Sequence, residues 1–276
     1  MLKISTDKFG KFQITCRLIH PVVYLDHCAI VEFANNPELG KKFINALKNK
    51  NGTLLMSSIN FFEAAGFNDV PQAQRIEEFL DDSLPNVYVA DFMKDPGFFF
   101  PNGSPDVKGE PKKHWLAEHM LLAAKANGGT PTFRTMFTEV VNQNNSFSKS
   151  FDDLKVTVAE TVDIFRNDPE RNQEGDEFTP DIDMYPPYLL MASILRDTQI
   201  NLNQKFGPND SIDFVHSISS VVRSDFVFLD RKWCNRVNRA EQYLAKFNVS
   251  LNLARRYWPS SNQFDAFFDD LGRFPC

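Results

Sequence analysis

The sequence predicts an α/β fold: a three-layer α/β/α architecture with a central, mostly parallel sheet, to which a helical insertion is added. Two observations lead to this prediction. Short apolar, β-rich runs occur near residues 21–26, 53–57, 86–92 and 225–230, and segments with helical spacing separate the first three of them. Such strand–helix–strand alternation is typical of a doubly wound parallel sheet, because the crossover helices pack on its faces.

The first third of the chain contains regular start and stop signals for these elements. Pro37 stands near the beginning of a helical stretch, and Asn51-Gly52 marks the turn into the second strand. Ser58 is a suitable N-cap for the helix that carries Glu63. The expected elements are a strand at 21–26, helices at 27–33 and 37–50, a strand from 53, a helix from 58, a helix at 70–84 and a strand at 86–92.

The middle of the chain interrupts this alternation. Residues 95–112 are rich in proline and glycine and predict a loop, and residues 168–183 form an acidic stretch that predicts a surface loop. Helical stretches are expected at 113–129, 152–169 and 186–206. We therefore expect a single domain over 1–276, with a core of about 20–95 and 205–250 and a helical insertion at about 100–205.

Composition indicates a folded globular protein. Hydrophobic residues make up 42% of 276 residues, which is enough for a sizeable core. No apolar run approaches the ~18–20 residues of a membrane span, and the N-terminus lacks the apolar region of a signal peptide. These features predict a cytoplasmic protein without a membrane partner. The cysteines are far apart and form no CxxC motif, so we expect thiols and neither a zinc nor a redox motif.

The charge distribution is uneven. The net charge of −6 argues against a protein that binds nucleic acid through bulk positive charge. However, residues 231–258 contain seven lysines or arginines and one glutamate. This stretch is either a surface that follows phosphates or an ordinary solvated helix face, and the second interpretation is favoured.

Four acidic residues carry the main functional hypothesis. Asp26 and Asp230 each end an apolar run, Glu63 follows another run, and Asp213 stands at the start of a helical stretch. Carboxylates at the C-terminal ends of parallel strands converge at one edge of a sheet and repel one another. Mg²⁺ or Mn²⁺ relieves such repulsion, because these ions prefer carboxylate oxygens. Asp210 is a further candidate ligand, although a helix-capping role is favoured for it, and capping is the ordinary alternative for the other aspartates.

The motifs YLDHCAI, SSINFFEAAG and NDSIDFVHSI…SDFVFLDRKW resemble the PIN domain, a family of Mg²⁺/Mn²⁺-dependent nucleases. The resemblance covers roughly residues 20–95 and 205–235. It implies that Asp26, Glu63, Asp213 and Asp230 are the catalytic metal ligands. The chain departs from the family in size, because about 100 additional residues lie between Glu63 and the late aspartates.

The resemblance implies a metal-dependent nuclease, and an endoribonuclease is the leading hypothesis. Arg231 and Lys232 directly follow Asp230 and are candidates for binding the substrate phosphate. His216 is a candidate partner that orients Asp213, with a structural role as the favoured alternative. RNA is the expected partner, together with an inhibitor protein or a second copy of the chain. Two other interpretations stay open: a non-catalytic PIN-like module that binds RNA or protein, and a nuclease of related fold that acts on DNA.

Overall fold

The computed structural model describes residues 1–64, 69–90, 124–142, 144–167, 179–180, 186–201 and 205–275. Its centre is a five-stranded sheet in the order β5-β4-β3-β6-β7, and every neighbouring pair is parallel. The strands are β3 (Val22–Leu25), β4 (Thr53–Ser57), β5 (Val87–Ala90), β6 (Phe226–Phe228) and β7 (Arg255–Tyr257). This sheet confirms the predicted α/β class with a parallel sheet.

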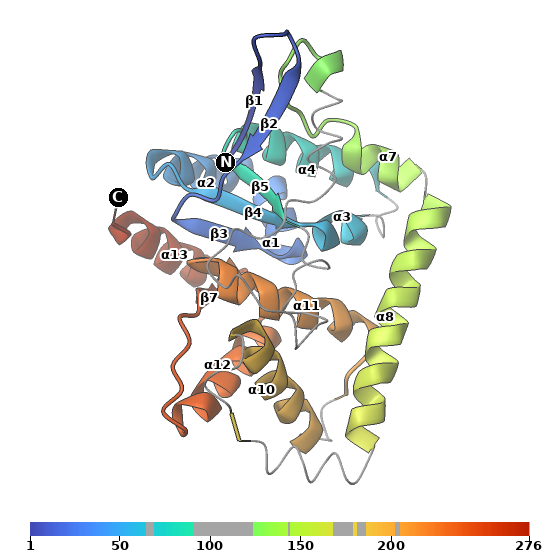
Figure 1. The fold of residues 1–276 in the computed structure, drawn as a ribbon, viewed down its shortest axis with the longest axis vertical. Coiled ribbons are helices and arrows are strands. Elements are labelled where there is room, and N and C mark those ends of the chain that lie inside the picture. Colours follow the sequence, from blue (N-terminus) through green and yellow to red (C-terminus); the bar gives the residue numbers. More distant parts are fainter. Residues whose placement is uncertain are drawn as a thin grey trace.

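Helices cover both faces of the sheet, which makes three layers (Figure 1). One face is covered by α1 (His27–Asn35), α2 (Pro37–Asn49), α4 (Val70–Ser83) and α13 (Ser261–Arg273). The other face is covered by α8 (Asn144–Asn167), α10 (Pro186–Ile200), α11 (Pro208–Arg223) and α12 (Arg231–Ala245). Successive side chains of β3 alternate between these two cores: Val23 joins the first, and Val22 and Tyr24 join the second.

A separate antiparallel hairpin precedes the sheet. It consists of β1 (Leu2–Thr6) and β2 (Phe12–Cys16) and forms its own two-stranded sheet. The hairpin projects from the body of the molecule (Figure 1). The backbone N–H of Leu2 donates to the carbonyl of Pro85 at 2.7 Å, which ties the hairpin to the segment just before β5.

Helices also dominate the described chain between β5 and α11. Besides α8 and α10, this part contains α7 (Met136–Asn142), while the short α3 (Ser58–Ala64) follows β4. The expected loop at 95–112, the start of the helix expected at 113–129 and most of the acidic stretch at 168–183 lie outside the described residues. The helix expected at 186–206 is shorter, because α10 ends at Ile200. Long α8 runs from the level of α7 to that of α10 (Figure 1).

The sheet core extends further than the sequence predicted. The expected core ended near residue 250, but β7 and α13 lie beyond it and join the first core through Tyr257 and Phe267. The basic stretch 231–258 is accordingly not one helix, since α12 ends at Ala245 and β7 follows. The strand went unrecognised because it is a three-residue edge strand of sequence RRY, which has neither an apolar run nor a clear alternation.

The first core depends on a group of packed phenylalanines, and this generates a prediction about stability. Phe33 is 1% exposed, and its ring lies with centroids 4.7–5.9 Å from four other phenylalanine rings. We expect Phe33→Ala to lower the free energy of unfolding by about 3–5 kcal/mol, because the substitution leaves a cavity. Phe9→Ala is the matched control, since Phe9 is 81% exposed, and it should change stability by less than about 0.5 kcal/mol. Urea denaturation measures both, and equal effects would contradict this assignment of the core.

Candidate active site at the carboxyl edge of the sheet

The site lies where the order of the strands reverses. From β3 the chain proceeds outward to β4 and β5, and it later returns to place β6 on the opposite side of β3. The register pairs Leu25 with Phe228, so the carboxyl ends of β3 and β6 are level with each other. In open α/β sheets such a switch point leaves a crevice at the carboxyl ends of the strands, and ligands bind there.

All four predicted acids gather around this crevice. Asp26 directly follows β3, and Asp230 lies two residues beyond β6. Glu63 comes from α3 and Asp213 from α11. Their charges interact: the pKa of Asp213 is raised to about 6, first by burial and then by contributions that include Glu63 and Asp230. The fold therefore brings together carboxylates that lie up to 204 residues apart in the chain.

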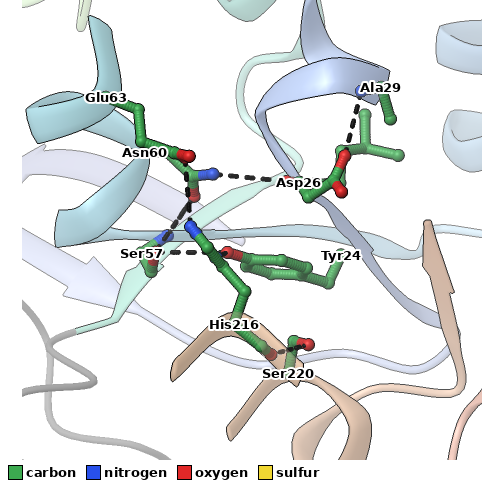
Figure 2. Close-up of polar contacts among 9 residues, drawn as sticks. Tyr24, Asp26, Ala29, Ser57, Asn60, Glu63, His216 and Ser220 are labelled. Carbon is green, nitrogen blue, oxygen red and sulfur yellow. Dashed lines mark hydrogen bonds and ion pairs between the residues drawn. The ribbon is translucent and has the colours of Figure 1, made fainter. Parts of the chain in front are cut away.

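Asp26 is the most buried of these acids. Its side chain accepts a hydrogen bond from the N–H of Ala29 at 3.0 Å, so it is the N-cap of α1 (Figure 2). Its own N–H donates to the carbonyl of Phe228 at 3.1 Å, which ties it to β6. The residue is 5% exposed, and burial raises its pKa to about 7, with Glu63 and Asp213 adding to the effect. The capping role and the place in the crevice are thus compatible.

Glu63 forms an ion pair with a buried histidine. Its Oε2 lies 3.0 Å from Nε2 of His216, which is only 1% exposed (Figure 2). Burial is the largest single influence on the pKa of His216 and lowers it, but the charge and hydrogen bond of Glu63, together with the charges of Asp26 and Asp213, raise the pKa overall. Conversely, burial is the largest single influence on the pKa of Glu63 and raises it, but the charge and hydrogen bond of His216, together with His27 and Lys155, lower the pKa overall. Both shifts favour an ionised Glu63 beside a protonated His216.

The partner of His216 differs from the one expected. The sequence suggested Asp213, three residues earlier on the same helix, but the hydrogen bond runs to Glu63 on α3. The other ring nitrogen, Nδ1, is hydrogen-bonded to the hydroxyl of Tyr24 on β3. Tyr24 in turn lies 3.3 Å from the hydroxyl of Ser57. Sequence spacing identified the histidine but not this partner, because the contact joins two helices that are distant in the chain.

Asn60 connects the same group to the sheet. Its side-chain oxygen accepts from the N–H of Ser57 at 2.8 Å, and its side-chain nitrogen donates to the carbonyl of Leu25 at 3.4 Å. Figure 2 shows this side chain between α3 and the end of β3. The beginning of α3, and with it Glu63, is thereby fixed against the two central strands. No sequence pattern singles out Asn60, and its position three residues before Glu63 is the one signal in the sequence that points to it.

A pocket of about 190 Å³ opens beside these acids. It is lined by His27, Glu63, Lys155, Asn209, Ile212 and Asp213. Two of the four carboxylates thus face a cavity, together with one lysine. The positive charge of Lys155 contributes to the lowered pKa of Glu63.

The remaining acids take part in helix capping. Asp230 is the N-cap of α12 and accepts from the N–H of Lys232 at 2.5 Å. Asp210 accepts from the N–H of Gly207 at 2.8 Å, so it caps α11 from its third position. The ammonium of Lys232 forms an ion pair with Asp210. Arg231 places its guanidinium 5.4 Å from the ring centroid of Trp258. The capping role favoured for Asp210 is therefore present.

The donor set is of the kind that Mg²⁺ or Mn²⁺ binds. It consists of carboxylate oxygens, and a bound cation would favour the ionised form of Asp26, whose pKa is raised mainly by burial and further by Glu63 and Asp213. Across the ranges that the structure describes, no three His, Cys, Asp or Glu side chains are already grouped as a metal site. Likewise, no described helix combines the length and apolar character needed to cross a bilayer.

Comparisons with models of protein families, with curated proteins and with solved structures find no match to this chain. The resemblance to the PIN domain accordingly rests on the order and spacing of the four acids, and nuclease activity remains a proposal.

The buried carboxyl of Asp26 makes stability depend on pH in a predictable direction. The unfolded chain loses this proton near the ordinary pKa of 3.8, whereas the folded chain keeps it until about pH 7. The contribution of this proton to the stability of the folded state is therefore complete below about pH 4, and it is lost as the pH rises through 7. In EDTA at pH 8, we therefore expect the free energy of unfolding of Asp26→Asn to exceed that of the wild type by up to about 4 kcal/mol. The helix cap is retained in this variant, because asparagine can also cap α1.

Urea denaturation at pH 4, 6 and 8 measures this effect. Asp265→Asn is the control, because its side chain is 80% exposed and should leave the pH profile unchanged. An Asp26→Asn protein with the same pH profile as the wild type would show that Asp26 ionises normally in the fold.

Proposed function

We propose that this chain is a metal-dependent nuclease, most specifically an endoribonuclease that hydrolyses phosphodiester bonds with Mg²⁺ or Mn²⁺. One observation carries the proposal: Asp26, Glu63, Asp213 and Asp230 interact electrostatically at the switch point of a parallel sheet. Carboxylates are costly to bring together without a compensating cation. Two of them, Glu63 and Asp213, also line a pocket through which a phosphate can approach.

The four carboxylates would hold one or two divalent ions. When bound, such ions supply an activated water and neutralise the charge of a phosphodiester. No nucleophilic side chain is then required, and none of the acids has to form a covalent bond. The resemblance to the PIN domain implies the same ligand set.

The other residues of the site position these ligands. His216 keeps Glu63 ionised and restricts its orientation, since the imidazole is itself held by Tyr24. Asp26 is held by the N-terminus of α1 and by β6. Lys155 lines the pocket and offers a positive charge to a phosphate oxygen. Arg231 and Lys232, at the beginning of α12, are positioned to do the same.

A second candidate function is a PIN-like module that binds RNA or protein without cleaving it. The ion pair between Glu63 and His216 favours this alternative, because a carboxylate that is already neutralised gains less from a metal ion.

RNA is proposed as the substrate over DNA on the resemblance alone. A cytoplasmic location is part of the proposal.

Cleavage assays test the catalytic proposal. With Mn²⁺, the wild type should cleave members of a panel of RNA and DNA oligonucleotides, and EDTA should abolish the cleavage. Asp26→Asn and Asp213→Asn should each reduce the rate by more than about 100-fold, because even the partners of metal ligands typically contribute 10- to 100-fold. Asp265→Asn is again the control and should retain the wild-type rate. Folded wild type that cleaves nothing would favour the binding module.

Metal affinity should also depend on pH. The pKa of Asp26 is raised to about 7 and that of Asp213 to about 6, so an ion must displace protons from these groups at acidic pH. Calorimetry should show Mn²⁺ binding that strengthens at least about tenfold between pH 5.5 and pH 8 and releases protons near pH 6.5. Equal affinity across this range would mean that neither carboxyl takes part.

A further inference from the structure

A second pocket, of about 500 Å³, lies on the basic side of α12. It is lined by Lys205, Lys232, Asn235 and Arg239, and no carboxylate is among these residues. The last three lie on one face of α12, at positions separated by three and four residues. A concave surface with three cations and one amide is suited to a ligand with several acceptor oxygens.

The cations of this pocket are held in place. The guanidinium of Arg239 binds Asp197 through two hydrogen bonds of 2.8 and 2.7 Å, and Asp197 is 6% exposed. Asp197 also accepts from the amide of Asn201 at 3.0 Å. A guanidinium has five N–H donors, so two bonds to Asp197 leave three for another acceptor. Arg239 is therefore oriented before any ligand arrives.

A buried arginine strengthens the positive charge beneath the pocket. Arg236 is fully buried, with its guanidinium 4.6 Å from the ring centroid of Trp233 and 5.9 Å from that of Phe206. Burial lowers its pKa, Asp210 and Asp197 oppose this effect, and the positive charges of Arg239 and Arg166 lower the pKa further. The charge of Arg236 is thus close enough to those of Arg239 and Arg166 to be repelled by them. An anion in the adjacent pocket would reduce this repulsion.

Lys232 connects the pocket to the acidic site. Its backbone N–H donates to the side chain of Asp230, the N-cap of α12, while its own side chain lines the pocket and pairs with Asp210. Asp210 in turn raises the pKa of Asp213. The acids and the basic pocket therefore lie on either side of the first turn of α12. Lys205 has no ion-pair partner within the part of the chain that the structure describes, so its charge is available to a ligand.

We propose that this pocket binds phosphate groups of the nucleic-acid strand that flank the scissile phosphate. This inference rests on the proposed nuclease function and names the path of its substrate along α12. The ligand chemistry is a phosphodiester, whose anionic oxygens accept hydrogen bonds from arginine, lysine and amide donors. A strand is favoured over a free phosphate compound because the pocket adjoins the site that would hold the scissile bond.

The test measures binding separately from cleavage. A fluorescent single-stranded RNA is titrated in EDTA between 50 and 200 mM salt, and affinity is followed by anisotropy. Lys205→Gln and the double variant Lys205→Gln/Lys232→Gln remove charge without removing a partner from buried Asp197. Lys3→Gln is the control, since Lys3 is an exposed residue of β1, far from α12 (Figure 1). Thermal unfolding verifies that each variant is folded.

We expect the double variant to bind RNA about tenfold more weakly at 100 mM salt. The slope of log affinity against log salt should decrease in magnitude by about 1.4, because each phosphate contact to a single strand contributes about 0.7. Lys205→Gln should show about half of this change in slope, and Lys3→Gln none. Unchanged affinity and slope in the double variant would overturn the proposal, as would a wild type that does not bind RNA at 50 mM salt.

Two further outcomes are informative. One distinguishes an RNA strand from a small polyphosphate as the ligand, and the other distinguishes the pocket proposal from the nuclease proposal. Inorganic triphosphate is used as a competitor, and if it binds the pocket as tightly as RNA does, the site is one for small polyphosphates and the strand assignment is wrong. If the wild type binds RNA with the expected loss in the double variant, yet Mn²⁺ produces no cleavage, then the nuclease proposal fails while the pocket assignment stands. The failure of one proposal is thus distinguishable from the failure of the other.

Discussion

The parallel pairing of β3 with β6 is the interaction on which the candidate site depends. It places Leu25 level with Phe228, and the N–H of Asp26 extends the ladder by one more hydrogen bond. The two halves of the chain, separated by the long helical segment, meet in the sheet through this pairing. Because the strand order reverses at this pair, the carboxyl edge is left open there, and α1, α3, α11 and α12 all begin near it.

The site is a set of negative charges that the fold has to stabilise in different ways. Asp26 and Asp230 lie at helix N-termini, where backbone N–H groups donate hydrogen bonds to their carboxylates. Glu63 uses the buried cation of His216. Asp213 is left with a raised pKa, because burial and its acidic neighbours outweigh its favourable contacts.

The net charge of −6 conceals two regions of opposite sign. Acids converge at the carboxyl edge of the sheet, and cations collect along α12 and at Lys205. The boundary between them is the first turn of α12, where Asp230 caps the helix and Lys232 turns toward Asp210. An anionic polymer would be repelled by the first region in the absence of a cation and attracted by the second.

The sequence by itself determined the alternation of strands and helices and the positions of Asp26 and Asp230, because apolar runs and the acids that end them are local patterns. It did not reveal β7, whose residues are charged and whose strand character comes from pairing with β6. Only the tertiary structure decided that His216 pairs with Glu63, and that Lys205 joins Arg239 in one pocket. These contacts join elements that are distant in the chain, and packing between layers, which no local pattern encodes, brings them together.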